Sequence, residues 1–530
     1  MHRTRSSLAL ILLIVPAVPA QAPEQLGPPA VAPAGTTVRD LWDAAYLDGH
    51  RAGYVHLKVE QIPGPKGEKI LRAAQEMNIS VRRGPDIARI PVLTGTDELP
   101  DGTVVGVFMI QGLGQNVKQE LRGRVEGNQL VVSATGPQAN YQKRIPWDPH
   151  VVSALGEQDL LRRRNPPPKP GDKFDYKTYN PIVNAVVTIH VEVENFEDVA
   201  LQSPTGVQRV RLLRVAMTPE EIQGVLLPSQ IVWYDDQFEV RKSLANLVGV
   251  GFLTTERTTE VLARQPIAPH LLPDIMDRQA IKLRQRIPNA HRESLLRYRI
   301  ALNDRDPGKT FANDPPRQTV SDVADKSFVL TVQAVRQPPA VVPAGVAAPG
   351  PEYSSSNYFI TSDDPKVKAQ ASAAVGSETD PWKKAQRIEA WVHRNMKVQN
   401  FTEAMAPAFQ VAESLSGDCT EYAMLTAAMC RAAGVPSRTA IGLVYVDPPP
   451  ARPPFFGFHM WTEVWVNGAW IGLDATLGQG SVGPAHLKIA DHSWDKTRSM
   501  TPLLPLMRVM MAQPSIEVLA MPARPVVMPR

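Results

Sequence analysis

The sequence contains very little cysteine. Only Cys419 and Cys430 occur in 530 residues. Small secreted domains that depend on disulfides carry many more, so this chain is not a disulfide scaffold. Two cysteines on one predicted helix, with His459 elsewhere, also lack the ligand spacing of a zinc site. We therefore expect no bound metal and no cofactor.

An excess of charge of one sign is also missing. Lys and Arg total 57 and Asp and Glu total 53, which gives a formal net charge of +4, and no dense basic run occurs. A nucleic-acid-binding surface normally needs such a run, so we expect no nucleic-acid partner. Apolar content of 43% and charged content of 21% are globular values.

Long apolar runs are scarce as well. Residues 1–22 have the pattern of a secretory signal peptide, in which Arg3 and Arg5 precede the apolar run Leu8–Val15 and a small-residue cleavage site. That run is too short to span a bilayer, and no later segment could do so. No cysteine near the cleavage site could carry a lipid. The sequence thus predicts export to the periplasm or the extracellular space, without an integral membrane segment after cleavage.

Beyond the leader, hydrophobic periodicity divides the chain. Alternating apolar residues such as Val55, Leu57 and Val59 predict a large antiparallel β-rich domain, followed by a small β domain. A Pro- and Ala-rich linker then separates these from a part with helices before an antiparallel sheet, which is an α+β arrangement. The predicted division is a signal peptide at 1–22, a Pro/Ala-rich leader at 23–37, a β-rich domain at 38–263, a small β domain at 264–336, a linker at 337–351, an α+β domain at 352–500 and a C-terminal tail at 501–530.

Cys419 lies at the predicted start of an apolar helix. Asp418 is a good N-cap residue, and Gly434 with Pro436 marks the C-terminal stop. The helix dipole and free amides of a first turn favour a thiolate, so the pattern predicts a lowered thiol pKa. A lone cysteine in an apolar helix is otherwise a small core residue, which is our expectation for Cys430. The two cysteines are 11 positions apart on one helix, which separates them by about 16 Å, too far for a disulfide, so both should be free thiols.

A hairpin places a histidine near an aspartate. Asn467-Gly468 predicts a two-residue turn, in which the numbers of paired residues sum to 935. Side chains alternate between the faces of a strand, so His459 and Asp474 share one face as diagonal neighbours. A carboxylate bonded to an imidazole fixes its tautomer and supports its charged form. On the same face, we expect Glu463 to pair with Arg438 of the preceding strand, because a buried charge needs a partner.

These pieces resemble the transglutaminase-like superfamily, a branch of the papain-like cysteine enzymes, over about residues 352–500. The resemblance implies Cys419 as nucleophile, His459 as base and then acid, and Asp474 as the residue that orients His459. Ala475 departs from the proline that many relatives have there, which affects the turn and not the chemistry. The second oxyanion donor is not identified. The matching blocks are G-D-C-T-E-Y-A at 417–423, C-R-A-A-G-V-P-S-R at 430–438, H-M-W-T-E-V-W at 459–465 and W-I-G-L-D-A-T at 470–476.

The resulting hypothesis is a secreted thiol enzyme that forms a Cys-linked acyl intermediate on amide bonds of a peptide or protein substrate. Water as acceptor gives a cysteine peptidase or amidase, and an amine gives a protein-glutamine acyltransferase. Hydrolysis is favoured, since an exported protein works in bulk water. Transfer would need a dry site. Its walls could come from Trp461, Trp465 and Trp470, and its lid from Phe455, Phe456 and Phe458 in a loop, although these residues could equally be core.

The alternative hypothesis is a catalytically silent transglutaminase-like scaffold or surface-binding protein. The presence of all three residues, Cys419, His459 and Asp474, argues against it. The oligomeric state and the identity of the substrate are left open.

Overall fold

The computed structural model describes residues 35–83, 86–112, 118–135, 141–181, 183–203, 206–221, 227–247, 251–274, 280–398, 406–495 and 501–519. The predicted signal peptide and most of the predicted leader lie outside these residues. Within the described part, no helix is long and apolar enough to cross a membrane. The chain divides into two compact units, one within Met1–Arg278 and the other within Gln279–Asn400 and Met405–Arg530.

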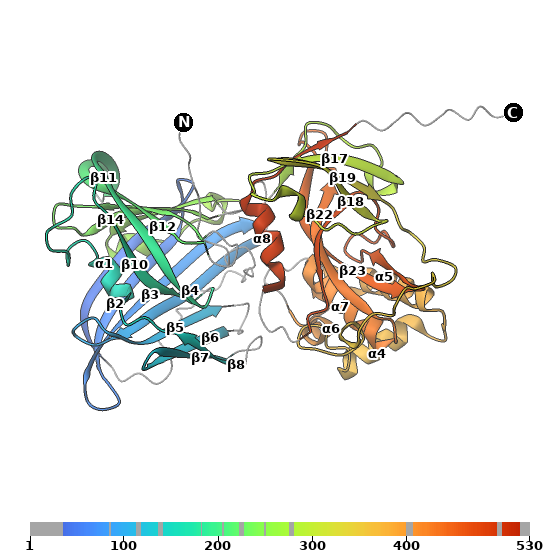
Figure 1. Ribbon diagram of the computed structural model, residues 1–530, viewed down its shortest axis with the longest axis horizontal. Helices are drawn as coiled ribbons and strands as arrows, with labels where there is room; N and C mark the ends of the chain where they lie inside the picture. Colours follow the sequence, from blue (N-terminus) through green and yellow to red (C-terminus); the bar gives the residue numbers. More distant parts are fainter. Residues whose placement is uncertain are drawn as a thin grey trace. The chain divides into compact units, whose positions relative to one another are not determined.

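The first unit is built on one sheet of fifteen strands, which Figure 1 shows to be strongly curved. Its order is β8-β7-β6-β5-β4-β3-β2-β1-β15-β14-β13-β12-β11-β10-β9, and all neighbours are antiparallel except β9 and β10. The predicted antiparallel, β-rich N-terminal part is therefore confirmed. The strands are β1 (Thr36–Leu47), β2 (His50–Pro63), β3 (Lys69–Arg83), β4 (Asp86–Glu98), β5 (Val104–Gly112), β6 (Lys118–Glu126), β7 (Gln129–Thr135), β8 (Tyr141–Pro146), β9 (Val151–Val152), β10 (Lys173–Asn180), β11 (Ala185–Ser203), β12 (Gly206–Pro219), β13 (Gln230–Tyr234), β14 (Val240–Leu247) and β15 (Gly251–Thr258).

Short helices complete this unit, namely α1 (Ala154–Gln158) and α2 (Glu260–Ala263). Helix α1 packs Leu155 against buried Leu57 and Val59 of β2. Ser153 caps α1, while the Asp148 carboxylate accepts from the His150 amide within a turn.

The second unit contains two larger sheets, a two-stranded sheet of β20 and β21, and a group of helices. In the view of Figure 1 most of these helices lie below the long strands β22 and β23, α8 is drawn to the left of β22, and a small sheet lies above. One sheet has the order β16-β23-β22-β25 with β24 also paired to β23, and the other has the order β18-β19-β17-β26. The strands are β16 (Ile281–Lys282), β17 (Leu295–Ala301), β18 (Gln318–Ala324), β19 (Ser327–Gln333), β20 (Lys397–Val398), β21 (Ser416–Gly417), β22 (Ser437–Val446), β23 (Phe455–Val466), β24 (Ala469–Leu473), β25 (His486–His492) and β26 (Ser515–Val518). The helices are α4 (Pro365–Val375), α5 (Pro381–Asn395), α6 (Ala408–Ser414), α7 (Cys419–Ala432) and α8 (Leu504–Met511).

The two sheets of the second unit share one hydrophobic core. Tyr298 of β17 meets Phe456 of β23 edge to face, with ring centroids 5.6 Å apart, and Phe328 and Leu487 are buried in the same cluster. Residues of the predicted segments 264–336 and 352–500 are thus joined by apolar packing. Within the predicted C-terminal tail, β26 pairs with β17 at the edge of the small sheet.

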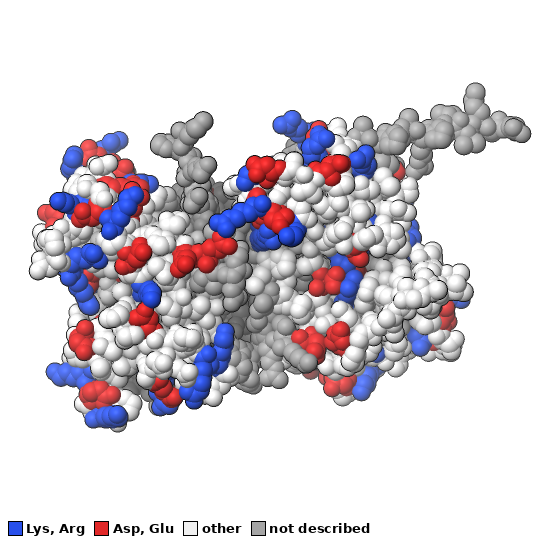
Figure 2. Space-filling model, in the orientation of Figure 1, with Lys and Arg blue, Asp and Glu red and all other residues white. Residues whose placement is uncertain are grey.

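The two signs of charge alternate on the face shown in Figure 2. Blue and red side chains are interspersed over the described residues of each unit, without a large area of one sign in this view.

Candidate active site

Helix α7 places Cys419 at its first position, as the sequence predicted. The Asp418 side chain accepts from the Thr420 amide, and the Glu421 side chain accepts from the Asp418 amide, which together make a capping box. Gly417 has a φ of +154°, and a Cβ there would lie 2.3 Å from the Cβ of Glu421. The glycine therefore allows Glu421 to fold back over the turn, which fixes the entry of the chain into the helix.

The two cysteines differ in their surroundings. Both are free thiols, as predicted. Cys419 is partly exposed, whereas Cys430 is fully buried and burial raises the pKa of its thiol to about 12. A buried thiol with so high a pKa forms almost no thiolate at neutral pH. Cys430 is thus a core residue, and Cys419 is the thiol that a substrate could reach.

The predicted hairpin register is confirmed. Strands β23 and β24 pair Val466 with Ala469 and continue to Thr462 and Leu473, where the ladder ends. Asp474 therefore does not pair with Trp461 but opens a turn. Its Oδ1 accepts from the amides of Thr476 and Leu477 at 3.0 and 3.2 Å, and its own amide donates to the Gly480 carbonyl.

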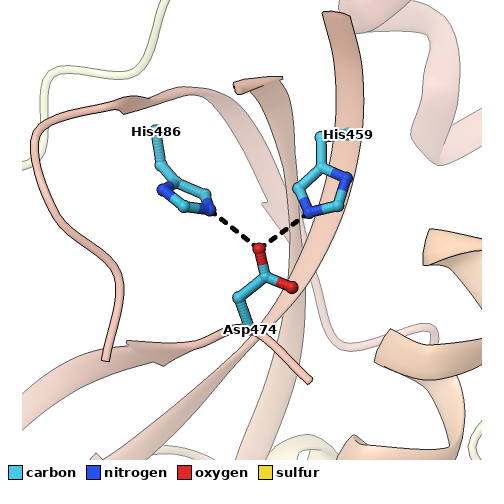
Figure 3. A group of neighbouring side chains, drawn as sticks. All are labelled: His459, Asp474 and His486. Atoms are coloured by element: carbon cyan, nitrogen blue, oxygen red, sulfur yellow. Dashed lines mark hydrogen bonds and ion pairs between the residues drawn. The ribbon is translucent and has the colours of Figure 1, made fainter. Parts of the chain in front are cut away.

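The structure places His459 against Asp474, with Cys419 in their neighbourhood. His459 Nε2 donates to Asp474 Oδ2 at 2.9 Å (Figure 3), and His459 is near enough to Cys419 to lower the pKa of its thiol. Asp474 is fully buried and His459 is 8% exposed. The arrangement thus places a partly exposed cysteine beside an imidazole that a buried carboxylate holds in place.

The carboxylate controls the charge of the imidazole. Burial lowers the pKa of His459, but the charge of Asp474 and its hydrogen bond outweigh burial and raise the pKa to about 10. Burial would raise the pKa of Asp474, whereas its two histidine partners hold that pKa well below its usual range. His459 is therefore an imidazolium and Asp474 a carboxylate at neutral pH.

The thiol pKa differs from the sequence-based prediction. Burial raises the pKa of Cys419, and the Asp418 carboxylate adds to the rise, while hydrogen bonds from His459 and from the Met460 amide lower it. The predicted net lowering by the helix N-terminus is wrong, because desolvation and the capping carboxylate outweigh it. The thiolate accordingly depends on the neighbouring imidazolium.

Sequence reasoning missed His486. This residue begins β25, is fully buried, and donates from Nε2 to Asp474 Oδ2 at 2.9 Å, so both histidines share one oxygen (Figure 3). On β22, Gly442 is paired with His459 and Val444 with His486. Because residues two apart on a strand face the same way, the two histidines point to one side of the sheet. No turn signal in the sequence ties β25 to β22, so this juxtaposition had no local signature.

The same three side chains offer a set of metal-ligand atoms. The ligand atoms of His459, Asp474 and His486 all lie within 4.8 Å of one another, and they are of the types that Zn²⁺ takes. In this structure His459 Nε2 and His486 Nε2 each donate a hydrogen bond to Asp474 Oδ2.

A buried charge network lies on strands β22, β23 and β25. Arg438 pairs with Glu463 at 2.8 Å, which confirms the prediction, and Lys488 of β25 also contacts Glu463 at 2.9 Å. Asp491 contacts both cations, at 2.8 and 2.9 Å. Each of these charges therefore has a partner, and the network joins β22, β23 and β25.

Helix α5 holds the turn that carries Asp474. His393 Nδ1 donates to the Ala475 carbonyl at 2.9 Å, and the Glu389 carboxylate accepts from the Gly480 amide at 3.1 Å. These two contacts fix the turn on either side of its tip, so Asp474 is positioned by helix and sheet together.

The aromatic residues do not form the lid that the sequence suggested. Phe455, Phe456 and Phe458 belong to strand β23 and not to a loop, and Phe456 is fully buried. Trp461 is only 1% exposed, so it is core. Trp465 and Trp470 are half-buried and pack edge to face at 5.4 Å. A dry, walled site therefore has less support than the sequence suggested.

A comparison with known protein families matches the part of the chain that contains these residues. Residues 368–475 match the family model of the "Transglutaminase-like superfamily". That span includes Cys419, His459 and Asp474. No curated protein matches the chain.

Three solved structures are similar to parts of the chain. A "putative cysteine protease" from Cytophaga hutchinsonii has 19% identity and a TM-score of 0.28, and the match covers 42% of this chain and 83% of that one. A β-barrel-like protein of a domain of unknown function from Brucella abortus has 11% identity and a TM-score of 0.30, with coverage of 41% and 94%. The periplasmic domain of TgpA from Pseudomonas aeruginosa, bound to ethylmercury, has 14% identity and a TM-score of 0.21, with coverage of 35% and 91%. At TM-scores this low, these similarities add nothing about chemistry to the site geometry.

Proposed function

Because residues 368–475 form a transglutaminase-like domain, we propose that this chain is an exported thiol enzyme that acts on amide bonds of peptides or proteins through Cys419. The observation that carries the proposal is the hydrogen bond by which Asp474 holds His459, beside Cys419 at the start of α7. Export rests on the signal-like pattern of residues 1–22. Site geometry supports catalysis more directly than it supports any binding role.

In the first step, the Cys419 thiolate attacks the carbonyl carbon of the substrate. A C–S bond forms, the carbonyl π electrons move to oxygen, and the tetrahedral intermediate collapses with loss of the C–N bond. His459, an imidazolium at neutral pH, gives its Nδ1 proton to the departing amine, since its Nε2–H is held by Asp474. The amine leaves and an acyl thioester on Cys419 remains.

In the second step, neutral His459 acts as a base. It removes a proton from water while the water oxygen attacks the thioester carbon, and the C–S bond breaks. The acid product leaves, and the thiolate and imidazolium are restored. A primary amine in place of water would give a transamidation product by the same route.

The start of α7 supports the developing negative charge on oxygen. Cys419 is the first residue of the helix, so its amide has no partner inside α7, and the positive end of the helix dipole lies beside the sulfur. Preorganised amides of this kind stabilise an oxyanion in a partly dry site.

Hydrolysis is the favoured outcome. Water is the abundant acceptor for an exported protein, and the predicted aromatic lid over the site is absent among the described residues. The proposed activity is therefore that of a cysteine peptidase or amidase, with protein-glutamine acyl transfer as the competing reaction.

A trapping experiment tests this function. The full chain is incubated with a mixture of peptides and proteins, with and without excess primary amine, and acid-quenched samples are analysed by mass spectrometry. We expect an acyl adduct on Cys419 and hydrolysed product, both abolished in Cys419→Ala. Cys430→Ala is the matched control, because that buried thiol should not react. If Cys419→Ala gives the same products as wild type, Cys419 is not the nucleophile; if neither protein forms any product, the silent scaffold replaces the enzyme.

A further inference from the structure

The Asp474 carboxylate accepts hydrogen bonds from four donors. Oδ1 accepts from the Thr476 and Leu477 amides, and Oδ2 accepts from His459 and His486. A carboxylate has about four acceptor sites, so these bonds fully occupy it. Rotation of the carboxyl group would break several of them at once. The orientation of Oδ2 toward His459 is thus set by the other three donors, of which His486 is the only side chain.

His486 is held in one protonation state and one tautomer. Its Nε2 lies against an acceptor, so the proton must be on Nε2, and its buried Nδ1 has no hydrogen-bond partner in the described structure. An imidazolium would carry an unsatisfied N–H at Nδ1 in a buried site, which is costly. Burial lowers the pKa of His486 to about 4, in accordance with this geometry. His486 is therefore a neutral hydrogen-bond donor to Asp474, whereas His459 is a charged donor to the same carboxylate.

The surroundings of His486 hold the ring in place. Its backbone carbonyl accepts from Arg317 at 3.1 Å, its ring meets Trp461 edge-on with centroids 5.3 Å apart, and the His291 ring is 5.7 Å away. The Trp461 side chain stands next to His459 on the same face of β23, with ring centroids 6.4 Å apart. These contacts leave the Nε2–H of His486 pointing at Asp474 (Figure 3).

We propose that His486 is a positioning residue for the reaction: its Nε2–H fixes the Asp474 carboxylate so that one oxygen stays aligned on His459. His486 touches neither substrate nor the sulfur, and acts only through Asp474. This inference rests on the function proposed above, because that function requires Asp474 to keep His459 ready for proton transfer. It adds a fourth residue, from β25, to a site that the sequence motifs limit to three.

Two substitutions of His486 distinguish the effect of its hydrogen bond to Asp474 from the effect of its packing. His486→Phe keeps a planar ring in the buried space but removes the donor. His486→Gln places an amide N–H near the position of the imidazole Nε2 and keeps the donor. Both variants are made in the full chain, and their thermal unfolding is compared with wild type, so that only folded protein is assayed.

We expect His486→Phe to lower kcat by about 10- to 100-fold, the usual effect of groups that orient another residue of a site, with KM within about twofold. His486→Gln should recover most of kcat. The alkylation rate of Cys419 by iodoacetamide, measured by mass spectrometry at fixed pH, should fall in the Phe variant and return in the Gln variant. This second readout needs no substrate, so it tests His486 even if turnover proves absent and the proposed function fails.

Equal activity and equal alkylation in folded Phe and Gln variants would overturn the inference, because the role would then be packing. A higher KM with an unchanged kcat would also overturn the inference. Stoichiometric Zn²⁺ retained by purified wild type and lost in His486→Phe would also overturn it, by showing that the cluster of His459, Asp474 and His486 is a metal site.

Discussion

Arg438 and Glu463 lie directly opposite each other on β22 and β23, and the guanidinium donates to the carboxylate at 2.8 Å. Glu463 is 1% exposed, and its second cationic partner, Lys488, is completely buried. The negative charge of Glu463 therefore stabilises both buried cations, Arg438 and Lys488.

Glu463→Gln should therefore destabilise the second unit by about 3–5 kcal/mol, because it removes the buried carboxylate that Arg438 and Lys488 share and leaves the more exposed Asp491 to compensate them only in part. The measurement is the urea unfolding midpoint followed by tryptophan fluorescence, with a double-mutant cycle that adds Arg438→Met. The matched control is Glu517→Gln, which removes an exposed ion pair with Arg299 and should change stability by less than about 1 kcal/mol. Additive effects of the Glu463 and Arg438 substitutions would contradict the network.

The same carboxylate predicts a pH dependence of stability. Burial would raise the pKa of Glu463, but Lys488 and Arg438 outweigh burial and lower it to about 2, against 4.5 for an unperturbed glutamate. A depressed native pKa contributes stability that is fully present above about pH 4.5 and is lost as pH falls toward 2. In acid unfolding between pH 6 and 2, wild type should lose stability more steeply than Glu463→Gln. Parallel curves would show that another group controls the acid transition.

Catalytic activity should depend on pH through Cys419 and His459. The reactive pair needs a thiolate, whose pKa burial raises above 9.0, and an imidazolium, whose pKa is about 10. We expect alkylation of Cys419 and substrate turnover to increase above neutral pH, and turnover to fall as pH passes about 10. Asp474→Asn should move the upper limit to lower pH, since the charge that raises the His459 pKa is gone. Full activity at pH 6 would rule out this assignment.

Gly442 allows β22 and β25 to approach each other beside the site. A Cβ at this position would lie 1.9 Å from the Leu487 carbonyl oxygen, which is backbone and cannot turn aside. Gly442→Ala should push β25 and His486 away from His459, with a loss of stability of at least about 1–3 kcal/mol and a loss of turnover. Gly457→Ala is the control on the neighbouring strand, where the nearest atom would be Phe455 Cε2 at 3.5 Å. Comparable unfolding midpoints in the two variants would refute the steric argument.

The sequence predicted those parts of the site that depend on local signals. Asp418 and Gly434 mark the ends of α7, and Asn467-Gly468 sets the register that brings His459 near Asp474. His486 and Lys488 could not be predicted in this way, because β25 reaches β22 through a loop without a diagnostic turn. The thiol pKa was mispredicted for a related reason, as it depends on burial by distant parts of the chain. Trp461 and Phe456 likewise needed the tertiary packing to be recognised as core.

Each compact unit is completed by pairing an early strand with a late one. In the first unit Trp42 of β1 is opposite Thr258 of β15, and in the second Ile300 of β17 is opposite Ile516 of β26. Contacts of such long sequence separation form slowly, because a large loop must close before they contribute. During synthesis, β17 has an open edge until residue 516 has left the ribosome, and open edges invite pairing with other chains. The folding of the second unit is therefore expected to need its last strand, and the Cys419 site would mature only after synthesis is nearly complete.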